Sequence, residues 1–262
     1  MLTSGGGSIP LPESLVDKLR DARSIAVLTG SGVSAESGVP TFREAQTGLW
    51  ERYDPHELAT PEAYERDPQL VWEWYSWRRQ LVEKAVPNPG HEALAELERN
   101  LVGGFVLITQ NVDGLHRRAG SEQLLELHGN ITRSRCPIEE IIVEPSSDDH
   151  GIPPACPGCG ASLRPDVVWF GEALPAGTLE EAFMAARGCD LFISAGTSGL
   201  VHPAASLPFE ALQSGAVLVE VNPNDTPLTR HADYALRDLA GEALPKLVEA
   251  AFREDRGERP GR

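Results

Sequence analysis

Residues 28–43, LTGSGVSAESGVPTFR, follow a short apolar run and contain three glycines within nine residues. A strand that ends in such a turn and continues as a helix presents backbone N–H groups and the positive end of a helix dipole, which together favour phosphate binding. Gly30, Gly32 and Ala35 fit the G-x-G-x-x-G/A pattern of dinucleotide-binding turns. The pattern alone also fits an ordinary strand–helix turn. Its continuation to Arg43, which adds an aromatic ring and a guanidinium, favours a binding loop.

The bulk composition predicts one large α/β domain with room for a small insertion. Of 262 residues, 41% are hydrophobic and 24% are charged, which suffices for a packed core. A net charge of −16 argues against binding to nucleic acid or to an anionic membrane. Because the sequence shows neither a membrane-spanning run nor a basic-then-apolar signal, and its four cysteines do not indicate a disulfide framework, we expect a cytoplasmic enzyme. Residues 1–10 and 254–262 are expected to be a disordered N-terminus and a flexible tail.

Four short apolar runs predict strands that are buried on both faces of a parallel sheet. They lie at residues 24–27, 105–108, 190–193 and 216–219. The last three are followed by the polar segments TQNVD (109–113), GTS (196–198) and NPND (222–225). In an open parallel sheet the ligand binds outside the carboxyl ends of the strands, where all these segments would lie. We therefore predict an α/β fold, a Rossmann-like parallel sheet with helices on both faces, and a ligand site at that edge.

The remaining segments divide the chain into a main domain and two insertions. Residues 11–132 and 164–253 are expected to form the Rossmann-like domain. Within it, residues 46–99 contain prolines, an aromatic cluster and no convincing strand pattern, which predicts a helical insertion. Residues 133–163 are rich in proline, glycine, serine and aspartate and hold three of the four cysteines, so we expect a small zinc-ribbon-like insertion domain.

A dehydrogenase is the first enzyme class that a dinucleotide-binding fold suggests. In that class a second strand follows the glycine turn by about 20 residues and ends in an acidic residue that binds the adenine ribose. Here the corresponding region belongs to the predicted helical insertion. Chemistry on the dinucleotide itself, rather than hydride transfer, therefore fits the chain better.

Six segments, taken in order, resemble the motifs of the sirtuin family of NAD-dependent protein-lysine deacylases. They are GSGVSAESGVPTFR, TQNVDGLH, ELHGN, RPDVVWFGE, GTSGLVHPAASLP and VEVNPNDTPLT. The resemblance spans residues 25–252 and points to the class III branch, which is known for removing acidic acyl groups. It implies NAD as cofactor, acyl-lysine proteins or peptides as substrates, and nicotinamide, free lysine and O-acyl-ADP-ribose as products. Removal of succinyl, malonyl and acetyl groups is expected.

The resemblance assigns catalytic roles to His128, Asn111 and Asp113. His128 would act as general base on a ribose hydroxyl, a task that suits an imidazole with a pKa of about 6.5. Without the family, it would also fit a structural histidine at a strand end. The NAD-binding residues implied by the resemblance are Gly30, Ser31, Gly32, Ala35, Thr41, Phe42, Arg43, Trp50, Gln110, Asn111, Val112, Asp113, Gly196, Thr197, Ser198, Asn222, Pro223, Asn224 and Ala240.

Substrate contacts are implied at two places in the chain. The segment Val167, Val168, Trp169, Phe170 and Gly171 would pair with the substrate backbone as an added strand. This mode reads main chain more than side chains, so broad protein targets are expected. From the residues alone, the same segment would be an ordinary edge strand.

The second place concerns the acyl group. Tyr75 and Arg78 lie three residues apart in a helical stretch, so their side chains share a face. They match the Tyr-x-x-Arg of the acidic-acyl branch, and Ala59 matches the small residue that makes room in its pocket. A guanidinium and a phenol can together bind the terminal carboxylate of a succinyl or malonyl group. The alternative is a surface Arg78 paired with an acid such as Glu73, beside a core Tyr75.

The chain departs from the family at its metal site. The family pattern is two CxxC pairs; Cys156 and Cys159 form the second, whereas the first has Cys136 and Glu139. Three thiolates can hold zinc with a carboxylate or a histidine as fourth ligand, so Glu139 or His150 could complete the site. Loss of the metal is the other possibility. Cys189 lies beside a strand and is expected in the core, and Ser31 replaces a usual alanine.

The rival interpretation is a catalytically weak module that binds NAD or ADP-ribose in the same fold. Its sign in the sequence would be a lost general base or a lost Asn–Asp pair. His128, Asn111 and Asp113 are all present. The sequence therefore favours the enzyme.

Overall fold

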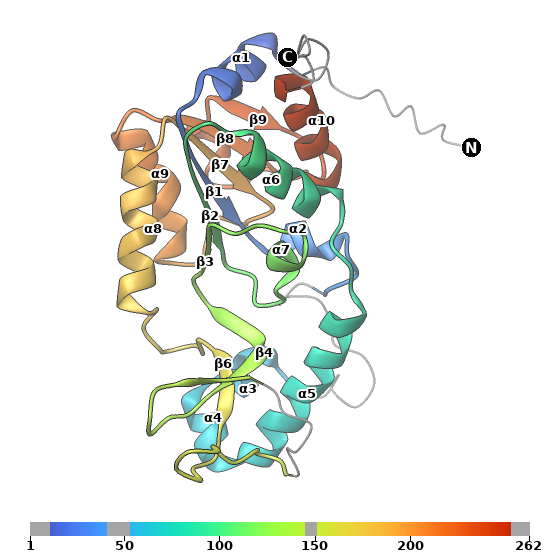
Figure 1. Ribbon diagram of the computed structural model, residues 1–262, viewed down its shortest axis with the longest axis vertical. Helices are drawn as coiled ribbons and strands as arrows, with labels where there is room; N and C mark the ends of the chain where they lie inside the picture. The colour runs from blue at the N-terminus through green and yellow to red at the C-terminus, as the bar shows by residue number, and fades with distance from the viewer. Residues whose placement is uncertain (1–10, 41–52, 145–150, 253–262) are drawn as a thin grey trace, which may run out of the picture.

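The computed structural model describes residues 11–40, 53–144 and 151–252. Its main element is a six-stranded parallel sheet with strand order β3–β2–β1–β7–β8–β9 (Figure 1). The strands are β1 (Ser24–Thr29), β2 (Gly104–Thr109), β3 (Leu124–Glu126), β7 (Leu191–Ala195), β8 (Val217–Val221) and β9 (Tyr234–Leu236). The predicted Rossmann-like parallel sheet is confirmed. The short edge strands β3 and β9 were not predicted, because three residues are too few to show a hydrophobic period.

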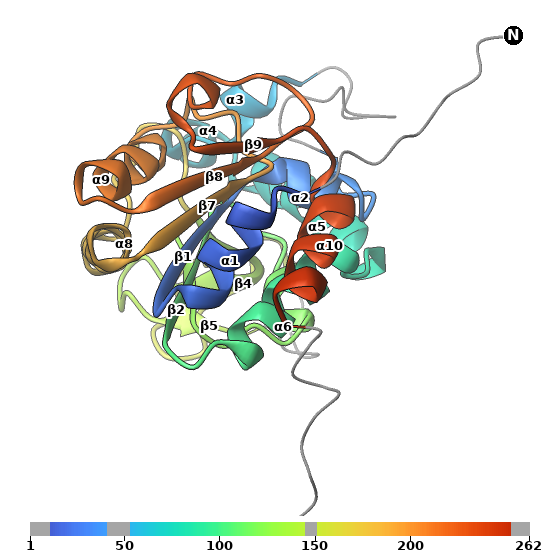
Figure 2. The same ribbon diagram turned by 90° about the horizontal axis from the view of Figure 1, so that it is seen from above.

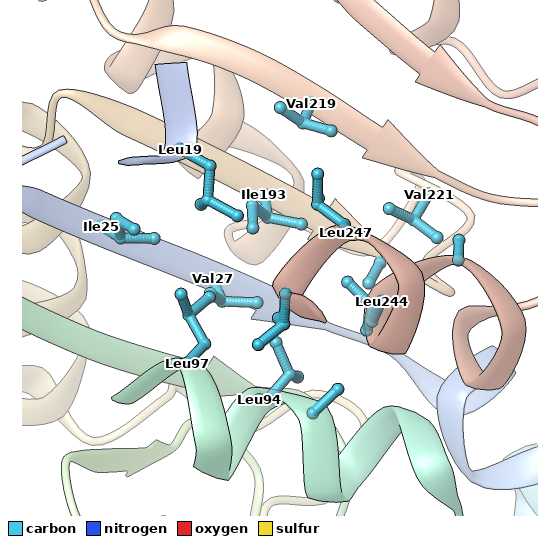
Figure 3. Close-up of a cluster of buried hydrophobic side chains, with 14 of the residues drawn as sticks. Leu19, Ile25, Val27, Leu94, Leu97, Ile193, Val219, Val221, Leu244 and Leu247 are labelled. Carbon is cyan, nitrogen blue, oxygen red and sulfur yellow. The ribbon is translucent and has the colours of Figure 1, made fainter. Parts of the chain in front are cut away.

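Helices cover both faces of this sheet, as Figure 2 shows from above. On one face lie α1 (Glu13–Asp21), α6 (Pro89–Asn100) and α10 (Ala240–Phe252); on the other lie α8 (Ala176–Gly188) and α9 (Leu207–Gln213). Successive strand residues point to opposite faces. In β1, therefore, Ile25 and Val27 pack toward α6 and α10, whereas Ala26 and Leu28 pack toward α8 and α9. Figure 3 shows the first of these cores, where Leu94 of α6 lies among the strand residues.

The order of the strands creates a switch point beside β1. The chain runs from β1 outward to β2 and β3 and later returns to place β7 on the opposite side of β1. Helices after neighbouring strands then leave in opposite directions, which opens a crevice at the carboxyl ends of β1 and β7. Gly30 follows β1 and Gly196 follows β7 at this point. The fold thus places two of the predicted binding segments side by side.

A second, smaller unit lies below the carboxyl edge of the large sheet in Figure 1. Its antiparallel sheet has the order β5–β4–β6, with β4 (Gly129–Arg135), β5 (Ile142–Val143) and β6 (Arg164–Val167). The helices α3 (Pro55–Leu58), α4 (Pro61–Arg66) and α5 (Pro68–Lys84) pack against it. One core joins Trp74 and Tyr75 of α5 to Ile131 of β4 and to Trp169. A second cluster joins Trp72 of α5 to Cys136, Cys156 and Leu163, so the two segments predicted as separate insertions pack together.

Two predicted boundaries change in the structure. The helical insertion was predicted over 46–99, but α6 packs on α10 and the large sheet and so belongs to the main domain. The cysteine-containing insertion was predicted over 133–163, but its sheet begins at Gly129 and ends at Val167. A helical pattern or a run of turn residues does not show which core its apolar side packs against, so the sequence alone could not set these boundaries.

Some predictions fall outside the described residues. These are the proposed NAD contacts Thr41, Phe42, Arg43 and Trp50, the alternative metal ligand His150, and the flexible ends at 1–10 and 254–262. Among the helices that the structure does describe, none combines the length and the apolar character that crossing a membrane would need.

Candidate active site

The glycine turn after β1 packs directly against the turn after β7. The Gly30 N–H donates to the Ala195 carbonyl at 3.0 Å, and the Gly32 N–H donates to the Gly196 carbonyl at 2.9 Å. A Cβ on Gly32 would lie 2.8 Å from the Gly196 oxygen, and Gly196 itself has φ +60°. Side chains at these positions would force the two strand ends apart. Because glycine has no side chain, the two backbones themselves form the floor of the crevice, which the close approach of a dinucleotide requires.

Asn111 is fixed from three directions at the end of β2. Its side-chain amide donates to the Gly30 carbonyl and to the Ser34 hydroxyl, each at 3.0 Å, and its own N–H donates to Thr109 Oγ1 at 3.0 Å. Its residue surface is 8% exposed. A buried amide held in this way has one orientation, so the turn after β2 is locked to the glycine turn after β1.

Two stacked histidines lie behind Asn111. The rings of His91 and His116 are 4.7 Å apart, and both residues are fully buried. Burial lowers the pKa of His91 to about 4 and that of His116 to about 3, so both are neutral at physiological pH. His116 Nε2 lies 2.9 Å from Thr29 Oγ1, and His91 Nε2 lies 3.4 Å from Ser34 Oγ. This neutral polar layer supports the ends of β1 and β2 without placing a charge under them.

Side chains from three further strand ends form a continuous chain of hydrogen bonds. Gln110 Nε2 donates to Thr197 Oγ1 at 3.1 Å, and Asn222 Nδ2 donates to the Thr197 carbonyl at 2.9 Å. Asn222 Oδ1 in turn accepts the Asn224 N–H at 3.1 Å. The structure therefore gathers the predicted segments after β2, β7 and β8 along one edge.

Asp113 is a buried carboxyl at the same edge, with 4% of its residue surface exposed. Burial raises its pKa above the ordinary value, and the hydrogen bond donated by the Leu115 N–H at 2.9 Å opposes this. The charge of Arg118 lowers the pKa of Asp113, and that of Glu126 raises it. A carboxyl in such surroundings is suited to hold a polar hydroxyl of a bound ligand rather than to face water.

His128 stands between the large sheet and the small unit. Its Nδ1 lies 2.9 Å from the Gln110 carbonyl, which can only accept, so Nδ1 carries the proton and Nε2 keeps its lone pair. Burial lowers the pKa of His128 below its ordinary value of 6.5, and the bond to Gln110 opposes this shift only in part. Gly129 follows with φ +80° and approaches the Asp166 carbonyl too closely for any Cβ. The imidazole is thus a neutral, oriented base.

The predicted acyl-binding residues meet in the core of the small unit. Ala59 and Tyr75 belong to one buried cluster with Trp169, and Val112 from the turn after β2 packs against it. The Tyr75 hydroxyl accepts the Trp169 indole N–H at 3.0 Å. Arg78 is half-buried one turn further along α5, with its guanidinium 5.0 Å from the centre of the Trp74 ring. Burial lowers the pKa of Arg78, whereas the nearby Tyr75 and Asp113 raise it.

The proposed alternative for Arg78 was an ion pair with Glu73 on the surface. In the structure Glu73 Oε1 instead accepts a hydrogen bond from Gln69 at 2.9 Å. Tyr75 and Asp113 both raise the pKa of Arg78; Tyr75 belongs to the acyl cluster and Asp113 to the polar edge of the sheet. Arg78 is therefore within electrostatic reach of both parts of the site.

The segment 167–171 is only in part the strand that was predicted. Strand β6, at the edge of the small sheet, ends at Val167. Beyond it the Val168 N–H donates to the His128 carbonyl at 3.0 Å, and the Phe170 N–H donates to the Ala59 carbonyl at 2.9 Å. The Trp169 N–H donates to Glu172 at 2.8 Å. These three N–H donors have partners within the chain, and pairing of the segment with a substrate backbone stays a prediction.

Several site residues were not found from the sequence. Ser34 and His91 support Asn111, and Arg237 bonds the carbonyls of Asn222 and Asn224 at 3.3 and 3.2 Å. Glu220, a buried acid, accepts from Arg237 and from two threonine hydroxyls. A charged residue inside the apolar run VLVEV was the available signal for Glu220.

The other predicted NAD contacts differ in how exposed they are. Ser31 and Ala35 are exposed on α2 (Ser31–Ala35). Ser198 is half-buried after β7, and Pro223 is exposed after β8. Ala240 begins α10 and is buried at 4% exposure against Gly90 of α6. Ala240 is therefore part of the helix packing, and its contact with NAD stays a prediction.

The predicted metal ligands converge in the small unit. Cys136, Glu139, Cys156 and Cys159 each offer one ligand atom, and these atoms all lie within 4.8 Å of one another. The Sγ atoms of Cys136 and Cys159 are 3.5 Å apart, close to the roughly 3.8 Å that two thiolates at 2.3 Å from a tetrahedral zinc would have. Glu139 Oε2 lies 3.1 Å from Cys156 Sγ. The donor set fits zinc, with Glu139 in the fourth position.

We expect purified protein to contain about one zinc per chain, because the three thiols and Glu139 supply the four ligands that a closed tetrahedral zinc site needs. Glu139→Ala should release its zinc to a chelator sooner than the wild type, as measured by a zinc-sensitive dye. Cys189→Ser is the matched control, since that thiol is buried beside β7 and donates to the Ala186 carbonyl. A metal content near zero in folded, active protein would contradict the assignment.

Comparison with known proteins agrees with this geometry. The model of the Sir2 family matches residues 30–203. The chain is 51% identical over 233 residues to an NAD-dependent protein deacylase of Aquifex aeolicus, covering 86% of this chain and 94% of that protein. It is 52% identical over 241 residues to an NAD-dependent protein deacylase of Thermus thermophilus, covering 88% and 91%. The chain therefore belongs to the Sir2 family.

Solved structures give the same result. A Sir2 homologue in complex with NAD superposes with a TM-score of 0.87 at 48% identity and covers 94% of this chain and 95% of its own. A Sir2 protein bound to acetylated peptide superposes with a TM-score of 0.80 at 29% identity, covering 93% and 98%. The expected resemblance to the sirtuins is thereby confirmed.

Proposed function

We propose that this chain is an NAD-dependent protein-lysine deacylase that removes succinyl and malonyl groups in addition to acetyl groups. NAD-dependent deacylation follows from membership of the Sir2 family and from close relatives that are NAD-dependent protein deacylases. The acidic-acyl preference rests on one observation: Tyr75 and Ala59 meet in one buried cluster, with Arg78 beside them. The products are nicotinamide, free lysine and O-acyl-ADP-ribose.

The edge of the large sheet is the proposed NAD site. The floor of the site is the backbone of Gly30, Gly32 and Gly196, where a Cβ would collide with the facing turn. Such a side-chain-free floor is what a bound pyrophosphate needs. Thr197 would contact phosphate, Asn222 and Asn224 the adenosine ribose, and Gln110, Asn111 and Asp113 the nicotinamide ribose and carboxamide. NAD supplies an electrophilic ribose carbon, from which nicotinamide departs when the acyl oxygen attacks.

His128 is the proposed general base. Because Nδ1 is committed to the Gln110 carbonyl, Nε2 is the atom that can take a proton from a ribose hydroxyl. Its lowered pKa keeps it neutral, and the Gln110 bond stabilises the imidazolium that forms when it accepts the proton. Asn111 and Asp113 would position the ribose, since each is held by its own buried hydrogen bonds.

The small unit is the proposed acyl site. Tyr75 presents a hydroxyl and Arg78 a guanidinium, and Ala59 occupies little volume beside them. A guanidinium can bind a carboxylate through two parallel hydrogen bonds, and charge-assisted bonds are stronger in a site shielded from water. No disulfide joins any of the four cysteines, which suits the reducing conditions of the cytoplasm that we propose as its location.

The test is nicotinamide release from NAD with three peptides that differ only in the lysine modification: succinyl, malonyl or acetyl. We expect NAD-dependent release with all three and higher kcat/KM for the acidic groups. Release with acetyl peptide alone would overturn the acidic-acyl preference. Binding of NAD or ADP-ribose by calorimetry without release from any peptide would instead support the rival binding module.

The lowered pKa of His128 predicts the pH dependence of the reaction. A base must be unprotonated, so activity is lost as pH falls through its pKa. Since burial lowers that pKa below 6.5, the acid limb of kcat/KM for the peptide at saturating NAD should have its midpoint below pH 6.5. An acid limb centred above pH 6.5 would contradict the role of His128.

Acid unfolding must be measured alongside this profile. His91 and His116 have pKa values of about 4 and about 3 when folded, so below pH 6.5 the unfolded chain binds protons that the folded chain does not. The free energy of unfolding therefore decreases as pH falls in this range. Circular dichroism at each pH shows whether the loss of activity precedes the loss of fold, as we expect.

A further inference from the structure

The side chain of Trp169 points into the core of the small unit and not toward a substrate strand. Trp169 follows β6, and 3% of its residue surface is exposed. Its indole N–H donates to the hydroxyl of Tyr75 on α5 at 3.0 Å, and Tyr75 is 2% exposed. The bond joins residues 94 positions apart in the chain. It is therefore a tertiary link between the segment after β6 and the proposed acyl site.

Trp169 is held rigidly by three neighbours. The Arg164 guanidinium lies 3.6 Å from the centre of the Trp169 ring, and the Tyr64 ring lies 5.3 Å from it. Arg164 also binds both carboxylate oxygens of Glu172, at 2.6 and 2.8 Å. The same carboxylate accepts the Trp169 backbone N–H at 2.8 Å. Ring and backbone are thus both fixed, and so is the direction of the indole N–H.

The direction of this hydrogen bond decides what Tyr75 can do. An indole N–H only donates, so the phenol oxygen must be the acceptor and the phenol hydrogen stays available for another acceptor. Burial raises the pKa of Tyr75 to about 12, which keeps that hydrogen in place at physiological pH. A carboxylate is an acceptor that this hydroxyl can serve together with the Arg78 guanidinium.

We propose that Trp169 determines acyl specificity as a positioning residue: its indole N–H orients the Tyr75 hydroxyl so that the hydroxyl donates to the carboxylate of an acidic acyl group. This rests on the proposed acidic-acyl function of the same site. The Arg164–Glu172 pair, by holding the ring and the backbone of Trp169, completes the support. An acetyl group has no carboxylate, so the orientation of Tyr75 should matter much less for it.

The test compares wild type, Trp169→Phe, Tyr75→Phe and the double variant on succinyl and acetyl peptides. Phenylalanine keeps an aromatic ring under Arg164 but lacks the N–H. We expect Trp169→Phe to reduce the succinyl-to-acetyl ratio of kcat/KM about fivefold, as loss of one buried hydrogen bond would. In the Tyr75→Phe background, where no hydroxyl remains to orient, it should change the ratio less than about twofold.

Trp72→Phe is the matched control. That indole lies on the same helix as Tyr75 and donates to the Leu163 carbonyl at 2.8 Å, away from the Tyr75 hydroxyl. Its loss removes the same kind of bond and should leave the ratio unchanged. A fall of both activities by the same factor in Trp169→Phe, or an effect of the same size with and without the Tyr75 hydroxyl, would show that Trp169 only supports the fold and would overturn the proposal.

The wild type tests the proposed function, whereas the Trp169→Phe variant tests this inference, so the two can be contradicted separately. If the acidic-acyl function is wrong, the wild type itself will not turn over the succinyl peptide. If only the inference is wrong, the wild type will act on the succinyl peptide and Arg78→Met will abolish this preference, while Trp169→Phe retains it. Melting curves of all variants accompany the kinetics, so that a loss of fold is read separately from a loss of selectivity.

Discussion

His128→Ala is expected to fold normally and to lose deacylation by about 10²–10⁴-fold, the usual contribution of a general base. Within the described part of the chain, the ring is hydrogen-bonded from Nδ1 to the Gln110 carbonyl, so its removal disturbs little of the core. What is lost is the Nε2 lone pair that takes the proton from the ribose hydroxyl. The measurement is kcat with the succinyl and acetyl peptides at saturating NAD.

Two comparisons make this result specific. His231→Ala removes an exposed imidazole elsewhere on the large domain and should keep wild-type turnover. Calorimetry should show that His128→Ala still binds NAD, since the glycine floor and Asn111 are intact. Near wild-type turnover of His128→Ala with NAD saturating would refute the assigned role.

Arg78→Met should lower kcat/KM for the succinyl peptide by at least about tenfold. Hydrogen bonds to a charged group contribute about 1.5–3 kcal/mol, which corresponds to roughly 10–150-fold. Methionine retains much of the length and apolar stem of the side chain, so the packing beside Trp74 is largely kept. Deacetylation offers no carboxylate to bind and should change little or improve. Both rate constants are measured on both proteins.

Arg79→Met is the control that the helix itself provides. Arg79 donates to the carbonyls of Ile131 and Arg133 and stacks 4.8 Å from the Trp72 ring centre, so it ties α5 to β4. Its loss should lower the melting temperature and affect both peptides alike. If Arg78→Met also reduced both activities equally, Arg78 would have a structural role like its neighbour, and the acidic-acyl preference would lose its main support.

The order of local patterns along the chain was enough to predict most of the fold. An apolar run and the polar turn after it are contiguous, so the sequence predicted β1, β2, β7 and β8 and the polar segments at their ends. The rule that ligands bind at these ends then predicted that Gly30, Asn111 and Thr197 would meet, and hydrogen bonds now connect their turns. The motif order likewise predicted the Sir2 family.

The sequence could not show which segments and side chains far apart in the chain contact one another. Residues 46–99 showed a helical pattern throughout, yet α6 packs on the large sheet and α5 on the small one. The ligand pattern left Glu139 or His150 as the fourth ligand, with loss of the metal as the other possibility; the structure brings Glu139 to the three thiols, and His150 lies outside the described residues. In both cases the deciding quantity is the distance between residues far apart in sequence.

By itself, then, the sequence determined the strands, the glycine turn, the polar residues at the strand ends and the family, because each depends on neighbours within a few residues. Only the tertiary structure decided the protonation and the hydrogen-bond partners of each functional group. His128 is a neutral base with a committed Nδ1 because Gln110, which follows another strand, faces it. The Trp169 side chain is buried in the small unit and donates to Tyr75, because packing its large ring against Arg164 and the α5 core is more favourable than exposing it at a sheet edge. Hydrogen-bond partners and burial belong to the folded chain, and these two set the chemistry of the site.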